Sequence, residues 1–254
     1  MNKSIINYEK LHSTFAKINI STPKSFLWFH YSDFLNNSSF KALYDSYPDI
    51  SFFEEHKDLM RNYNQAPHDR FYLAFEKSIF HSSDYTGSGI IRMNQLPKCW
   101  QDFIGELNDK RYNEFIKMVL NLENYTARYD WHIGIKGNAV SPHIDAKPKL
   151  ASHLFYFNTS PEWNQDWGGR TLILQSKKTS VMNPSFDDFN EIISIENLDN
   201  KSLLFKNSES AWHGVEPLKC PENRFRKLFN VIFEVNNANE LTLNERANMQ
   251  TRMV

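Results

Sequence analysis

The spacing of hydrophobic residues divides the chain into two halves. Residues 1–122 predict a helical and mixed half, in which Asp109–Leu122 has the apolar spacing of an amphipathic helix. Proline favours the first turn of a helix and ends one that precedes it, and Pro48 and Pro97 provide such boundaries. The predicted helices are Ser39–Tyr47, Pro97–Leu107 and Asp109–Leu122, and the predicted strands are Ser25–Tyr31 and Phe71–Phe75. The polar residues 1–25 predict a short helix and a loop.

The pattern changes after residue 123, where short apolar and aromatic runs alternate with turn residues. Runs of this kind, rich in Phe, Tyr, Leu and Ile, predict strands. The predicted strands are Tyr125–Tyr129, Ala139–Asp145, Leu154–Asn158, Arg170–Gln175, Ile192–Ile195, Ser202–Lys206 and Arg224–Glu234, with a tight turn at Gly168-Gly169. Many short strands separated by turns favour an all-β sandwich or barrel.

The length and composition fit one domain with a sizeable core. The chain has 254 residues, of which 41% are hydrophobic and 15% aromatic, and a chain of this length is compatible with a single large domain. We therefore expect a single domain over 1–254. It would comprise a helical and mixed N-terminal support over 1–122, a strand-rich core over 123–235 and a polar C-terminal tail over 236–254.

Charge and cysteine content exclude several classes of protein. The net charge of −1 indicates neither a nucleic-acid partner nor a membrane surface. Cys99 and Cys220 are far apart and form no CxxC motif, which favours reduced thiols in a cytoplasmic protein. The N-terminus has no apolar leader, and no run approaches the roughly 20 apolar residues of a membrane span.

Three residues have the composition of an iron site. His143 and Asp145 are two positions apart on a predicted strand, so their side chains leave the same face. His213 follows a later apolar strand and can complete that face from a neighbouring position. Two histidines and one carboxylate with open positions on the metal are the ligand set of a non-haem Fe(II) oxygenase. The remaining histidines lack such a context: His12, His30, His56, His68, His81, His132 and His153. We expect His153 to point away from the site.

A cation is predicted beside this metal. A five-carbon keto diacid that chelates iron through its keto oxygen and adjacent carboxylate needs a buried cation for its far carboxylate. Arginine suits this task because its planar fork matches a carboxylate bidentately. By alternation, Arg224, Arg226, Leu228 and Asn230 share one face of a strand. Arg226 is the better candidate for burial, whereas Arg224 lies nearer a turn, and the sequence leaves the choice open.

Taken together, these motifs resemble a known family. In order along the chain they are Pro142–Asp145, Leu154–Asn158, Trp167–Leu172, His213–Val215 with Pro217, and Arg226–Asn230. This order resembles the Fe(II)/2-oxoglutarate-dependent dioxygenases, in particular the prolyl-hydroxylase-like group, over roughly residues 125–234. The resemblance implies a mainly β fold with flanking helices, in which a double-stranded β-helix (a jelly roll, cupin-like) forms the core.

The resemblance also implies roles for individual residues. His143, Asp145 and His213 would bind Fe(II), and Arg226, or Arg224 in its place, would bind the C5 carboxylate of 2-oxoglutarate. Tyr156 and Asn230 would contact the same cosubstrate. The implied cofactors are Fe(II), 2-oxoglutarate and O₂, with ascorbate as an optional reductant. Because Asp145 supplies the carboxylate that related halogenases lack, hydroxylation is the expected outcome, with desaturation or ring formation as alternatives.

Substrate contacts are predicted from residues that flank these motifs. Tyr129, Trp131 and Trp212 would line a pocket, and Lys149, with Lys147 beside it, would bind a substrate carboxylate. The segment Trp131–Asn138 is longer than the usual approach to the metal strand and predicts a substrate lid. The expected partner is a small molecule, with no nucleic acid and no membrane, and a homodimer is one option for the assembly.

The sequence thus predicts a hydroxylase of a small molecule, an amino acid or a natural-product intermediate. One alternative is a peptidyl or protein prolyl-type hydroxylase. Another is a jelly-roll protein that binds a metal or a sugar without redox chemistry, which would not need a buried arginine beside the metal.

Overall fold

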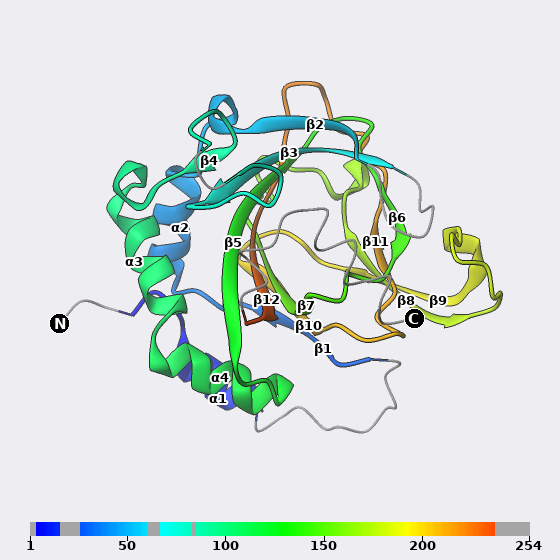
Figure 1. Ribbon diagram of the computed structural model, residues 1–254, viewed down its shortest axis with the longest axis horizontal. Helices are drawn as coiled ribbons and strands as arrows, with labels where there is room; N and C mark the ends of the chain where they lie inside the picture. The colour runs from blue at the N-terminus through cyan, green and yellow to red at the C-terminus, as the bar shows by residue number, and fades with distance from the viewer. Residues whose placement is uncertain (1–3, 16–25, 60–66, 83–84, 237–254) are drawn as a thin grey trace.

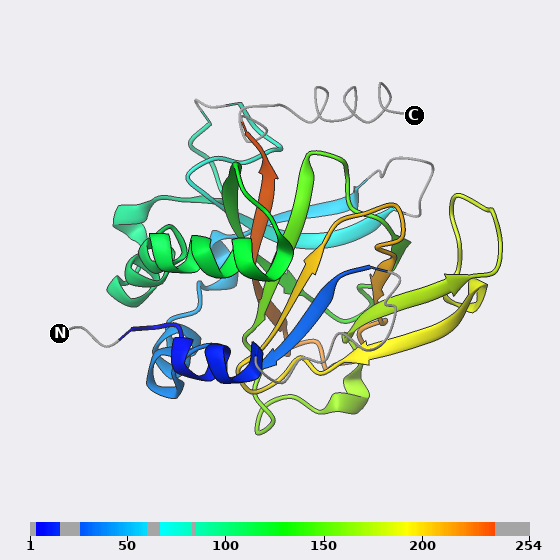
Figure 2. The same ribbon diagram turned by 90° about the horizontal axis from the view of Figure 1, so that it is seen from below.

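Two β-sheets face each other, and four helices cover the outer side of the larger one (Figures 1 and 2). The computed structural model describes residues 4–15, 26–59, 67–82 and 85–236. The helices are α1 (Tyr8–Phe15), α2 (Asn37–Asp45), α3 (Lys98–Leu107) and α4 (Lys110–Leu120). Among the described residues, no helix has the length and apolar character needed to cross a membrane.

The larger sheet is antiparallel apart from one short pairing. Its strands follow the order β1 (Trp28–Ser32), β10 (Lys201–Lys206), β7 (Lys149–Tyr156), β12 (Arg226–Val235), β5 (Tyr125–Gly134), β3 (His68–Phe75) and β2 (Glu54–Leu59), with β4 (Ile90–Ile91) parallel to β3. The smaller, antiparallel sheet follows the order β6 (Val140–His143), β11 (His213–Val215), β8 (Thr171–Lys177) and β9 (Phe189–Ile195). This is the predicted jelly-roll architecture.

Alternation along β12 divides the interior into two cores. Phe229, Val231 and Phe233 belong to the cluster that packs the large sheet against the helices. Leu228 belongs to a smaller cluster between the two sheets, which also contains Ile173 of β8. Successive side chains of a strand point to opposite faces, so Arg226 and Asn230 share the side of Leu228. We call this side of the large sheet its inner face.

The predicted helices are confirmed within a few residues of their ends. Pro97 directly precedes α3. The Asp109 carboxylate caps α4 by accepting a hydrogen bond from the backbone N–H of Tyr112 (3.0 Å). An aspartate at this position satisfies one of the unpaired N–H groups of the first turn. Asn121 ends α4 in the left-handed region, at φ 48°.

Two expectations about the chain's organisation need comment. The predicted lid over Trp131–Asn138 is wrong, because β5 runs through Gly134 and pairs with both β3 and β12. The N-terminal half is also more than a helical support, since it supplies β1, β2, β3 and β4 to the large sheet. Of the predicted tail over 236–254, residues 237–254 lie outside the described residues.

Candidate active site

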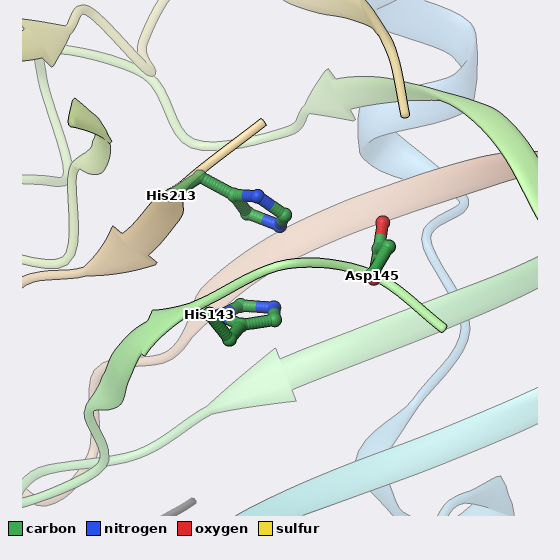
Figure 3. Close-up of side chains that lie close together, drawn as sticks. All are labelled: His143, Asp145 and His213. Atoms are coloured by element: carbon green, nitrogen blue, oxygen red, sulfur yellow. The ribbon is translucent and has the colours of Figure 1, made fainter. Parts of the chain in front are cut away.

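His143, Asp145 and His213 converge at one end of the β6–β11 pair of the small sheet (Figure 3). His143 ends β6, His213 begins β11, and the two residues are direct partners in the antiparallel pairing. Their rings lie 4.1 Å apart, centroid to centroid. One ligand atom from each of the three side chains lies within 4.8 Å of the others. Three donors this close can share a single metal ion.

Backbone carbonyls set the tautomer of both histidines. Nδ1 of His143 lies 3.0 Å from the carbonyl oxygen of Ser141, and Nδ1 of His213 lies 2.9 Å from that of Ala211. Because a carbonyl only accepts, each Nδ1 donates its hydrogen, and Nε2 becomes the nitrogen with a lone pair for a metal. Hydrogen bonds of this kind orient the ring and raise its basicity as a ligand.

A lysine holds the carboxylate of the triad. Lys149 Nζ donates to Asp145 Oδ1 at 2.7 Å, and Ser152 Oγ makes a long hydrogen bond of 3.4 Å to Oδ2. Lys149 thus orients the carboxylate, which offers one ligand atom to the triad. Two imidazole nitrogens and one carboxylate oxygen fit a non-haem Fe(II) centre.

Arg226 is a buried cation on the inner face. Its Nε donates to the carbonyl oxygen of Gly169 (2.6 Å) and its Nη2 to Thr171 Oγ1 (3.3 Å), while the guanidinium carbon lies 5.7 Å from the centre of the Tyr156 ring. Burial lowers the pKa of Arg226, although an arginine keeps its charge in a protein. Within the described part of the chain, no carboxylate forms an ion pair with it. Arg224, the alternative candidate, is exposed.

The other two predicted cosubstrate residues lie on the same inner face. Tyr156 is buried and donates its hydroxyl hydrogen to Thr171 Oγ1 at 2.8 Å. Asn230 is buried, and no described residue donates a hydrogen bond to its Oδ1 atom. A buried polar atom without a partner costs free energy, so an acceptor at this position fits a bound polar ligand. Thr171 was not predicted, because a threonine at the start of a strand has no distinguishing pattern.

Glycine is required at position 169 for two reasons. The residue has φ +78°, where side chains other than glycine are strained. A Cβ atom there would also lie 2.6 Å from Leu218 Cδ2 and 3.1 Å from Arg226 Cδ. The predicted Gly168-Gly169 turn therefore does more than reverse the chain, because it brings a carbonyl oxygen against the Arg226 side chain.

The structure does not bring the predicted aromatic substrate residues to the triad. Tyr129 and Trp131 belong to the core between the large sheet and the helices, where Tyr129 stacks on Phe229 and Trp131 meets Trp100 edge to face. Trp212 packs against Phe189 in a separate cluster beside β8. The physical reason is alternation, since each of these residues is one position away from a neighbour that faces inward.

The side chains of β5 that do face inward form a charged group that was not predicted from the sequence. Arg128 Nη1 donates to Asp130 Oδ2 (2.6 Å), and His132 Nε2 donates to Asp130 Oδ1 (2.6 Å). Arg128 also bonds to Tyr72 Oη (2.9 Å) and pairs with Glu234 (3.3 Å). The alternating pattern Arg-x-Asp-x-His on one strand could have indicated this group.

Burial and neighbouring charges together shift the pKa values of Asp130 and His132. Burial opposes the charge on Asp130, but His132 and Arg128 outweigh it and hold the pKa of the carboxyl below its usual range. Burial lowers the pKa of His132, against the pull of Asp130. His153, by contrast, points away as predicted, and hydrogen-bonds to Tyr112 Oη (2.8 Å) and Ser202 Oγ (3.1 Å) in the helix-facing core.

Comparison with known protein families gives one match. Residues 118–233 match the model of the 2OG-Fe(II) oxygenase superfamily. The matched segment contains the three triad residues, Arg226 and the segments that pack around them. A search of curated protein sequences found no match.

Solved structures share the fold at low sequence identity. A prolyl-4-hydroxylase from Pseudomonas putida superimposes with a TM-score of 0.55 at 14% identity, over 83% of this chain and 94% of that one. A prolyl hydroxylase from Trichoplax adhaerens gives 0.50 at 14% identity, over 97% of both chains. The carbocyclase SnoK from nogalamycin biosynthesis gives 0.51 at 9% identity, over 83% of this chain and 80% of that one. At these identities the likeness concerns the fold.

Proposed function

We propose that the chain, whose residues 118–233 match the model of the 2OG-Fe(II) oxygenase superfamily, acts as an oxygenase of this kind and hydroxylates an unactivated C–H bond of a small molecule. The substrate would be an amino acid or a natural-product intermediate. Enzymes of this superfamily use Fe(II), 2-oxoglutarate and O₂. When bound, the metal and 2-oxoglutarate supply the oxidising power, and 2-oxoglutarate is converted to succinate and CO₂. The residues of the chain bind, orient and exclude water around these groups.

In this proposal His143, Asp145 and His213 hold Fe(II), and Arg226 binds the C5 carboxylate of 2-oxoglutarate. The observation that carries the assignment is the buried guanidinium of Arg226, which has two neutral hydrogen-bond acceptors and no ion-pair partner among the described residues. A buried charge without a counter-ion costs several kcal/mol, and a bound dicarboxylate would remove that cost. The exposed Arg224 offers no such argument.

A small substrate is favoured by the inner face of the large sheet. Buried or half-buried charged groups occupy it, among them Arg128, Asp130 and His132, and such groups suit a compact polar molecule. The similar folds include both a prolyl hydroxylase in complex with a peptide fragment and a carbocyclase from a biosynthetic pathway. A peptidyl hydroxylase is therefore the second candidate, and succinate release with free amino acids or with proline-containing peptides separates the two. The cytoplasmic location and the homodimer stay predictions.

The first experiment is an anaerobic titration with Fe(II) and 2-oxoglutarate, followed by visible absorbance. Wild type should develop a weak charge-transfer band that Asp145→Ala and Arg226→Ala diminish. Arg224→Ala is the matched variant two residues away, and it should keep the band. Normal metal binding without a band in wild type would contradict the oxygenase proposal and favour a jelly-roll protein that only binds metal. Loss of the band in Arg224→Ala alone would move the anchor to that residue.

A further inference from the structure

One cation on the inner face has no role in the site described so far. Arg70 lies on β3, where the register pairs His56 with Arg70 and His132 with Tyr72. Residues directly opposite each other in an antiparallel pair point to the same side of a sheet. Arg70 and Tyr72 therefore share the inner face with His132 and, across the next strand, with Asn230, which faces Asp130.

The charges around Arg70 are already paired with one another. Arg128 forms ion pairs with Asp130 and Glu234, at 2.6 and 3.3 Å. The second oxygen of Asp130 takes the hydrogen of His132. These contacts make a closed network, so neither carboxylate provides a direct partner for Arg70.

Among the described residues, Arg70 forms hydrogen bonds with one group, and that group is neutral. Its Nε donates to Nε2 of His68 at 2.9 Å, and Nη2 also approaches that nitrogen. Because Nε2 of His68 accepts, the imidazole is neutral and gives no compensating charge. In the parts of the chain that the structure describes, no Asp or Glu pairs with Arg70.

The register of β3 and β5 places Arg70 on the inner face, beside the group that contains Asp130 and His132. Arg70 is half-buried, and burial lowers the pKa of its guanidinium, while Asp130 and the metal ligand Asp145 are among the charges that favour its ionised form. The same guanidinium acts on the pKa of His132 together with Lys149, which holds Asp145. Nη1 has no hydrogen-bond partner among the described residues, and Nη2 contacts only His68 among them, so the guanidinium keeps donors for a ligand.

We propose that the substrate carries an anionic group, a carboxylate or a phosphate, and that Arg70 binds it. The inference rests on the proposed function, because it places a second anion site beside the one that Arg226 provides for 2-oxoglutarate. Two arginines on the inner face of the large sheet would then bind the two molecules, Arg226 the cosubstrate and Arg70 the substrate. The planar fork of Arg70 favours a group with two equivalent oxygens.

Calorimetric binding to the anaerobic protein loaded with Fe(II) and 2-oxoglutarate tests this. The probes are matched pairs, namely free L-amino acids against their carboxamides and sugar phosphates against the parent sugars. The proteins are wild type, Arg70→Gln, Arg70→Lys and, as a matched surface control, Arg111→Gln on α4. Charge-assisted hydrogen bonds of about 1.5–3 kcal/mol correspond to roughly a 10- to 150-fold preference for the anion.

We expect at least one anionic probe to bind wild type and Arg111→Gln more tightly than its neutral partner by this factor. The preference should fall to about twofold or less in Arg70→Gln and be partly kept in Arg70→Lys, which retains the charge without the fork. Preference for amino acids or for sugar phosphates identifies the anion. The inference is overturned if acid and neutral partner bind alike, if no probe binds, or if the preference survives in Arg70→Gln. Failure of 2-oxoglutarate to bind wild type would instead contradict the proposed function.

Discussion

Replacing Gly169 with alanine should damage the cosubstrate site through a single methyl group. A residue other than glycine at φ +78° costs about 1–2 kcal/mol in backbone strain. The new Cβ would lie 2.6 Å from Leu218 Cδ2 and 3.1 Å from Arg226 Cδ, and overpacking of this kind costs about 1–3 kcal/mol. We therefore expect Gly169→Ala to lower the free energy of unfolding by about 2–5 kcal/mol.

Gly137 offers a control that separates strain from crowding. It has φ +87°, but a Cβ atom there meets nothing within 4 Å. Gly137→Ala should therefore cost only the strain, about 1–2 kcal/mol. Urea denaturation without cosubstrate measures both values, and the difference between them reports the crowding.

The crowding caused by a Cβ atom at position 169 should also weaken the binding of 2-oxoglutarate. Because the Gly169 carbonyl oxygen accepts a hydrogen bond from Arg226 Nε (2.6 Å), displacing either group changes the anchor. We expect Gly169→Ala to bind 2-oxoglutarate at least about tenfold more weakly, or about 1.4 kcal/mol, and Gly137→Ala to bind it as wild type does. Equal affinity in the two variants, measured by calorimetry with Fe(II) under anaerobic conditions, would refute the argument that the Gly168-Gly169 turn positions Arg226.

Three further predictions concern buried polar groups. Thr171→Val keeps the side-chain shape but removes the hydroxyl that accepts from two buried donors, so it should cost about 1–3 kcal/mol in urea denaturation and weaken 2-oxoglutarate binding; unchanged values would show that neither donor depends on it. Arg128→Met leaves Asp130 and Glu234 without their shared cation and should destabilise the fold by about 3–5 kcal/mol, whereas a loss below 1 kcal/mol would mean that water compensates them. Burial holds the pKa of His153 well below its usual range, so the unfolded chain takes up a proton there first and stability falls as the pH drops below about 6.5. Between pH 7.5 and 5.0, His153→Gln should therefore lose about 2 kcal/mol less stability than wild type, at 1.36 kcal/mol per pH unit, and identical pH profiles would contradict the assignment.

The metal ligands were predictable because their spacing is a local property. His143 and Asp145 are two residues apart, and the predicted strand Ala139–Asp145 placed them on one side. In the structure β6 ends at His143 and Asp145 follows it, yet the two side chains still converge. The structure adds what spacing does not contain, namely the pairing of His143 with His213 across β6 and β11. Arg226 and Arg224 could not be distinguished from the sequence, because the predicted strand Arg224–Glu234 placed both on one side. In the structure β12 begins at Arg226, and Arg224 precedes it and is exposed.

The substrate-facing residues were less predictable, and the reason is the register of one strand. The strand predicted from the sequence ends at Tyr129, whereas β5 continues through Gly134. The extension places Trp131 against the helices and His132 toward the second sheet. Successive side chains of a strand alternate between its two faces, so an error of one position exchanges the faces. Both faces of β5 are buried, so hydrophobicity alone did not show which side chains face the second sheet. Arg70 was missed for a related reason, since the segment before Phe71 contains no apolar alternation.

The pairing of β1 with β10 has a consequence for how the chain folds. Trp28 lies opposite Phe205, and β3 joins β5 across helices α3 and α4, so the large sheet is built from contacts between residues far apart in the chain. Loop closure over such distances makes folding slow. During synthesis, β1 and β3 leave the ribosome well before β5, β7, β10 and β12. Their apolar faces therefore stay uncovered until these later strands have been synthesised. We therefore expect folding to be completed only after synthesis, and fragments that end before residue 201 to require chaperones.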